Sequence, residues 1–122
     1  MNNFITKEIV DAAYRVHCTL GPGLMEHVYQ NCLEYEIRKR GLDVRSEIYL
    51  PVVYDSMVFK TGYRIDLLVE SEVIIELKVV AHLLPLHKAQ LLTYLKLAKK
   101  PVGLLINFNS KLIKEGIIRL VN

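Results

Sequence analysis

The stretch from Asp66 to Lys78 constrains the fold more than any other part of the chain. It consists of two apolar runs joined by a polar turn from Glu70 to Glu72, and Asp66, Glu76 and Lys78 interrupt the apolar runs. Charged residues are poor strand formers and are costly to bury without partners. Three such residues within two strands predict a site that holds a cation.

Strand alternation makes this prediction specific. Glu76 and Lys78 are two residues apart, so they share one face of their strand. A turn with an odd number of residues, such as Glu70 to Glu72, would set Asp66 directly across from Glu76. A two-residue turn would instead pair Asp66 with Ile75, which points to the opposite face. We predict the odd turn.

Two carboxylates on facing strands would have Cβ atoms about 5 Å apart. Bare anions at that separation repel each other, but a shared divalent cation would suit them, and oxygen ligands fit Mg²⁺ or Mn²⁺. The alternative is an exposed cluster that forms weak surface salt bridges. That alternative explains the charges but not why all three lie on one face beside long apolar runs.

Apolar periodicity and turn residues predict the remaining elements. Pro51 suggests an edge strand or a bulge, Gly62 a bend or bulge, Thr6 a possible helix N-cap, and Gly41 the residue after a helix end. The expected order is helices 5–19 and 24–40, strands 44–52, 57–69 and 73–80, helix 86–99, strand 102–107 and a short strand 116–121. This order predicts an α/β fold in which helices flank a mixed sheet.

Glu26 lies at the border of the apolar arc of the second predicted helix. A carboxylate in that position requires a partner, which can be an arginine, a hydroxyl, a backbone donor or a metal. A structural hydrogen bond and a metal both remain open at this point.

Length and composition narrow the class of protein. A chain of 122 residues is expected to form one domain, residues 1–122, and 52% apolar residues exclude a disordered chain. No apolar run approaches the length of a membrane span, and the first residues lack the layout of a signal peptide, so we expect a cytoplasmic protein without membrane contact. The net charge is +3. If the acids bind metal, the remaining surface is basic enough for a polyanion, although cations at helix C-termini explain the same residues.

The pattern Asp66-x9-Glu76-x-Lys78 resembles the PD-(D/E)xK nuclease superfamily, whose restriction-endonuclease-like core runs helix, three strands, helix, strand. Gln90 and Tyr94 form a Q-x-x-x-Y pattern, which resembles the RecB-like and phage exonuclease branches. The proline of the superfamily's name is absent, because an isoleucine precedes the aspartate; that position varies within the superfamily.

A further element, Gly23-x-x-Glu26-x-x-Tyr29, resembles the G-x-x-E-x-x-Y element of the GxxExxY protein family. The resemblance extends over nearly the whole chain. By itself, the pattern Asp66-x9-Glu76-x-Lys78 is a weak motif. It becomes specific because the other elements occur with it in the expected order along the chain.

The resemblance implies the roles of the site residues. Asp66 and Glu76 would ligate Mg²⁺ or Mn²⁺, Leu77 would lend its backbone carbonyl, and Glu26 matches the additional acid of the RecB-like and phage exonuclease branches. Lys78 would position or activate the attacking water. Gln90 and Tyr94 would order the metal shell and the scissile phosphate. Arg64 and His87 are weaker candidates for contact with substrate.

The activity implied is that of a metal-dependent phosphodiesterase that hydrolyses DNA, in preference to RNA, with magnesium-activated water. Two alternatives remain open. One is a non-catalytic nucleic-acid-binding or homodimeric assembly module on a nuclease fold, since a fold does not determine function. The other is an accessory factor that is active only in a complex.

Overall fold

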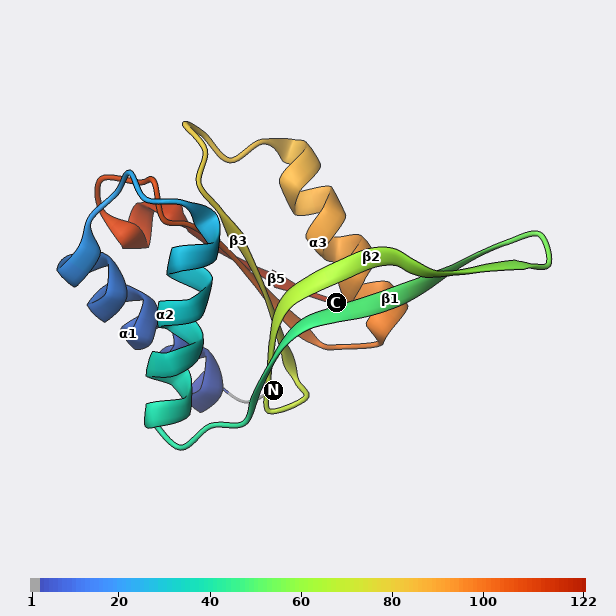
Figure 1. The fold of residues 1–122 in the computed structure, drawn as a ribbon, viewed down its shortest axis with the longest axis horizontal. Helices are drawn as coiled ribbons and strands as arrows, with labels where there is room; N and C mark the ends of the chain where they lie inside the picture. The colour runs from blue at the N-terminus through green and yellow to red at the C-terminus, as the bar shows by residue number, and fades with distance from the viewer. Residues whose placement is uncertain (1–2) are drawn as a thin grey trace.

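A five-stranded mixed sheet with helices on both faces forms the centre of the computed structural model, which describes residues 3–122 (Figure 1). The elements are α1 (Asn3–Leu20), α2 (Glu26–Lys39), β1 (Val44–Tyr54), β2 (Met57–Val69), β3 (Val73–Lys78), α3 (Pro85–Ala98), β4 (Val102–Asn107), the short 3₁₀ helix η1 (Ile113–Gly116) and β5 (Ile117–Val121). The strands lie in the order β1-β2-β3-β4-β5, and only β3 and β4 run parallel. The predicted α/β class, the mixed sheet and the final short strand are confirmed.

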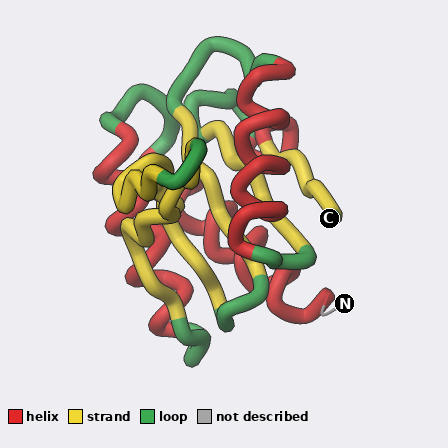
Figure 2. The backbone as a smooth tube through the Cα atoms, turned by 90° about the vertical axis from the view of Figure 1, so that its right-hand side faces the viewer, coloured by secondary structure: helices red, strands yellow, loops and turns green. Residues whose placement is uncertain are grey.

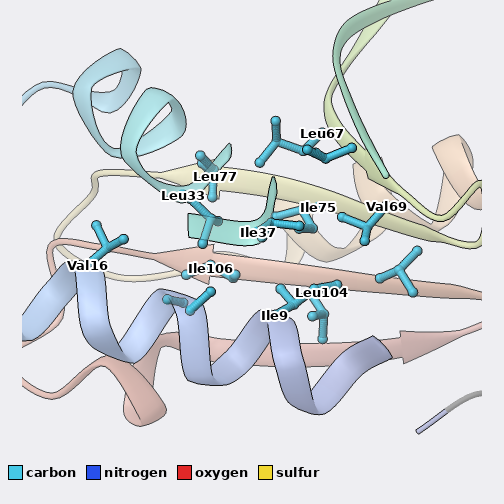
Figure 3. Packing of buried hydrophobic residues seen from close by; sticks show 14 of the residues in the cluster. Ile9, Val16, Leu33, Ile37, Leu67, Val69, Ile75, Leu77, Leu104 and Ile106 are labelled. Carbon is cyan, nitrogen blue, oxygen red and sulfur yellow. The ribbon is translucent and has the colours of Figure 1, made fainter. Parts of the chain in front are cut away.

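Two hydrophobic clusters hold the layers together. On one face, α1 and α2 pack against the sheet, and Figure 3 shows Ile9 of α1 beside Leu104 and Ile37 of α2 beside Ile75. On the other face, α3 places apolar residues such as Leu91 against the sheet. Figure 2 shows the strands lying between these helices. Because both faces are covered, β4 is buried along its whole length, as its unbroken apolar sequence predicts.

The β1–β2 hairpin extends beyond the helices as a projecting ribbon (Figure 1). We call residues 49–63 the arm. β1 is an edge strand, and the register of the pair shifts between Leu50 and Val52, so Pro51 lies both at an edge and at a bulge. A Cβ atom on Gly62 would lie 2.3 Å from the side chain of Val52, which explains why glycine is required there. Both expectations for Pro51 and Gly62 are confirmed.

Two helix starts differ from the sequence prediction. α1 already begins at Asn3, so Thr6 lies inside the helix, where it is buried, and is not an N-cap. α2 begins at Glu26, two residues later than predicted, because the backbone before it is extended at Met25. The predicted end is correct: Gly41 follows the C-cap with φ of +85°, a conformation that favours glycine.

Candidate active site

The candidate site lies where β2 and β3 separate. Their ladder pairs Val69 with Val73 and Leu67 with Ile75, so the turn between the strands has three residues, as predicted. Continuing this register by one pair sets Asp66 opposite Glu76. Ile75 packs in the cluster on the α1–α2 side, so Glu76, its neighbour, faces α3. Asp66 and Glu76 are both 4% exposed, which excludes an exposed cluster of surface charges.

The two carboxylates accept hydrogen bonds from the main chain of the opposite strand. The amide of Asp66 donates to Oε1 of Glu76 at 3.1 Å, and the amide of Leu77 donates to Oδ2 of Asp66 at 2.8 Å. Beyond the last ladder pair, Leu67 with Ile75, side-chain oxygens therefore take the place of backbone carbonyls as acceptors for these two amides. The acids thus satisfy buried donors at the point where the strands diverge, which is why the chain tolerates them there.

Burial makes the negative charge of this pair unfavourable. Burial, followed by the charge of Asp66, raises the pKa of Glu76 to about 8. Burial also raises the pKa of Asp66, against the opposing effect of its hydrogen bond from Leu77. Two buried carboxyl groups with raised pKa values favour either a proton or a cation between them. The site is therefore electrostatically prepared to receive positive charge.

Two cations and a third acid complete the electrostatic surroundings. Nη2 of Arg64 lies 3.7 Å from Oδ1 of Asp66, and Nη1 of the same arginine lies 3.5 Å from Oε1 of Glu47. Burial raises the pKa of Glu26, and the charge of Asp66 raises it further. Lys78 acts in the opposite direction on the pKa values of all three acids, Glu26, Asp66 and Glu76. The structure therefore brings Glu26 and Lys78 within electrostatic range of the acid pair.

α3 contributes the remaining residues. Tyr94 is buried, and its pKa is raised to about 12 by burial and then by the charges of Glu76 and Asp66, so its hydroxyl stays protonated beside the acids. Its ring meets that of Tyr63 edge-on, with centroids 5.4 Å apart. Gln90 lies one turn earlier and lines a groove with Tyr63.

His87 has a structural role that the sequence analysis missed. Its Nδ1 accepts a hydrogen bond from the backbone N–H of Leu84 at 2.9 Å, which caps the start of α3. The signal was present in the sequence, because His87 stands two residues after the proline that begins the helix. Its contact with substrate stays a prediction.

The comparison with known families decides the family. The model of the PD-(D/E)XK nuclease superfamily matches residues 3–120. The chain belongs to this superfamily. No curated protein and no solved structure matched the chain. Within residues 3–122, none of the helices is both long and apolar enough to cross a membrane.

The donor set fits the divalent metals that nucleases of this superfamily typically use. No three His, Cys, Asp or Glu side chains among residues 3–122 are gathered closely enough to hold a metal ion. Asp66 and Glu76 nevertheless offer adjacent carboxylate oxygens, the ligand type that Mg²⁺ and Mn²⁺ prefer. A cation beside them would offset the cost of burying negative charge, which is the main cause of the raised pKa of both acids. The roles of Glu26 and of the Leu77 carbonyl as further ligands stay predictions.

A hydroxyl clamp fixes the loop that precedes Glu26. The hydroxyl of Tyr29 donates to the carbonyl of Gly21 and accepts from the amide of Leu24 at 3.1 Å. Gly23, between them, has φ of +101°, where a side chain would be strained. The clamp fixes the loop just before Glu26, the first residue of α2. The ring of Tyr29 is fully buried and stacks on that of Phe108, with centroids 4.6 Å apart, so the residue anchors the loop to the core.

Asn107 fixes the chain after Lys78. Its Oδ1 accepts from the amide of Val80 at 3.1 Å, and its Nδ2 donates to the carbonyl of Val80 at 2.9 Å. Oδ1 also accepts from the amide of Asn109. Nothing in the sequence around Asn107 indicates these contacts. The asparagine holds the end of β3, and with it Lys78, against β4.

Proposed function

We propose that the chain is a metal-dependent phosphodiesterase that hydrolyses DNA in preference to RNA. The observation that carries this proposal is the buried pair Asp66 and Glu76, set opposite each other where β2 and β3 separate, with Lys78 next on the same strand face. A bound Mg²⁺ or Mn²⁺ would stabilise the negative charge that develops on the phosphate during hydrolysis.

The residues of the chain divide the remaining tasks. Asp66 and Glu76 would hold the ion, and Glu26 and the Leu77 carbonyl would be further ligands. Lys78 orients the attacking water through its ammonium group. The protonated hydroxyl of Tyr94 and the amide of Gln90 donate hydrogen bonds that would order the coordination shell of the metal and the scissile phosphate. Arg64 holds Asp66 in place and is exposed enough to meet a phosphate oxygen.

The pattern Gly23-x-x-Glu26-x-x-Tyr29 supports placing the chain in the GxxExxY family, and Gln90 with Tyr94 supports the RecB-like and phage exonuclease branch. The structure gives the first pattern a physical reason. Gly23 takes a backbone conformation that favours glycine, Tyr29 clamps the loop, and Glu26 begins the helix that the loop positions.

A second candidate function is a non-catalytic binding or assembly module. It is favoured by one observation: both carboxylates already accept main-chain hydrogen bonds, so the pair is partly satisfied without an ion. The raised pKa of Glu76 argues against it, since a glutamine could accept the same main-chain hydrogen bond without the cost of burying an acid.

The deciding experiment is metal-dependent cleavage of single-stranded DNA, double-stranded DNA and RNA. Wild type is compared with Asp66→Asn and Lys78→Met, and with the matched exposed controls Asp11→Asn and Lys111→Met. Loss of electrostatic stabilisation predicts a decrease of about 10²–10³-fold in the two site variants and none in the controls. Equal cleavage by all five proteins would overturn the site assignment. No cleavage by wild type, with DNA binding retained, would favour the module.

A further inference from the structure

The arm exposes more large apolar side chains than its own fold explains. Tyr49, Val53, Tyr54, Met57, Val58 and Phe59 are each more than half exposed. The segments 52–54 and 57–59 are two runs of three apolar residues that meet at the end of the hairpin. Exposed runs of this kind are a liability unless they serve binding.

Both faces of the arm are apolar. Val53 pairs with Val58, and the flanking pairs are Tyr54 with Met57 and Val52 with Phe59. Neighbouring pairs point to opposite faces of a ribbon. Neither face of the arm therefore presents the polar surface that a solvated hairpin normally shows, and an isolated two-stranded ribbon is only marginally stable in water.

The outer side of α3 exposes two large apolar side chains among polar ones. Leu86 is 73% exposed and Leu97 is 46% exposed on this helix. A groove of about 330 Å³ lies at the start of α3, beside the base of the arm, and its lining is Leu86, Ala89, Tyr63, His87, Gln90 and Thr93. The same region of the chain thus carries an apolar projection and, beside it, a groove with both apolar and polar lining residues.

We infer that the occupant of this groove is the arm of a second copy of the chain, so that two copies associate by exchanging arms across a twofold axis. A twofold interface uses the same patch on both subunits, so one patch must contain both the projecting and the receiving surface. This chain has both. Self-association can be measured without any nuclease activity, although His87 and Gln90 of this groove are also candidate site residues, so an arm seated there would lie beside the candidate site.

Charge and area support a second copy over a nucleic acid. From Tyr54 to Lys60 the arm carries one acid, Asp55, and one base, so it has no net charge with which to neutralise phosphates. The three exposed aromatic residues alone offer about 300–400 Å². That is close to half of the roughly 800 Å² that each partner buries in a stable interface, and the other apolar residues of the arm and α3 add to it.

The test measures the molar mass of the full chain by light scattering and sedimentation over a concentration series. Wild type is expected to reach twice 14.1 kDa. Val58→Asp in the arm and Leu86→Asp on α3 are each expected to raise the concentration for half-association at least tenfold. Tyr35→Ser, an equally exposed aromatic on α2, is the control and should behave as wild type. Thermal melting verifies that each variant is folded.

A mixing experiment tests the arrangement itself. Neither variant can form a good arm–groove contact with itself, but a mixture of Val58→Asp and Leu86→Asp retains one intact arm facing one intact groove. The mixture should therefore associate more tightly than either variant alone. A monomeric wild type at all concentrations would overturn the inference. A Leu86→Asp variant that stays dimeric would overturn the assignment of the groove. If wild type is monomeric and Val58→Asp binds DNA more weakly than wild type, the arm would be assigned to nucleic acid instead.

Discussion

Glu76 links the stability of the protein to pH. Its pKa is raised from 4.5 to about 8, first by burial and then by Asp66. Between these two values the folded state binds more protons than the unfolded state, so the free energy of unfolding falls as pH rises. We expect the Tm of wild type to decrease between pH 5 and pH 8, and Glu76→Gln to remove much of this slope. Asp11→Asn, at an exposed position, is the control and should keep the dependence of Tm on pH that wild type shows. If Glu76→Gln also keeps that dependence, the burial argument is wrong.

The same two acids predict how metal acts on the folded protein. Mg²⁺ or Mn²⁺ that binds only the folded state stabilises it, by about 2.7 kcal/mol at a hundred times the dissociation constant. Deprotonated carboxylates are needed, so the increase in Tm should be larger at pH 8 than at pH 5. Asp66→Asn should abolish the increase. A metal-induced shift of equal size in wild type and Asp66→Asn would place the ion elsewhere.

At the scale of elements, the loop between α1 and α2 depends on one hydroxyl. Tyr29→Phe would leave the carbonyl of Gly21 and the amide of Leu24 without their partner. Both hydrogen bonds are partly buried, and each contributes about 0.5–1.5 kcal/mol, so urea unfolding should show a loss of about 1–3 kcal/mol. Because the loop precedes Glu26, cleavage should also decrease. Tyr35→Phe, at an exposed position on α2, is the control, and an unchanged Tyr29→Phe protein would show that the clamp is dispensable.

The sequence predicted those parts of the site that follow from strand alternation. The pairing of Asp66 with Glu76 needed only the period of a strand and an odd turn, and both are local. The crossed hydrogen bonds to the main chain were not predicted, because they depend on β2 and β3 separating after Leu67 and Ile75. The contacts of Asn107 with Val80 were not predicted because they join residues that are 27 positions apart in the sequence.

The two strands of the arm were predicted, but its projection was not. An apolar run such as Val52, Val53, Tyr54 is typical of a core strand, so nothing in the pattern indicated that it would be exposed. In the structure the end of the hairpin extends past the helices (Figure 1), and Val53 and Tyr54 are exposed. A segment that looks like core but lies outside is consistent with burial against another molecule.

For the whole molecule, the body should fold without the arm. The two hydrophobic clusters hold no buried residue of the arm, although Leu50 and Tyr63 pack against one of them. Since Leu50 pairs with Tyr63, replacing residues 51–62 by an Asn-Gly turn would close the hairpin at that pair. The shortened chain should keep the cooperative unfolding of wild type and lose self-association. Circular dichroism and light scattering measure the two properties, and loss of cooperative unfolding would show that the arm is part of the folded core.

The strand segments between the acid pair and the turn limit how this protein can change over evolutionary time. Insertion or deletion of a single residue within 67–69 or 73–75 would move one of the two acids to the opposite face of the sheet. That acid would then enter the apolar layer beneath α1 and α2. Lineages that retain the site are therefore expected to vary the length of the turn, residues 70–72, and to keep the length of both strand segments. In a library of single-residue insertions, activity should be lost for insertions within 67–69 or 73–75 and kept for insertions within the turn.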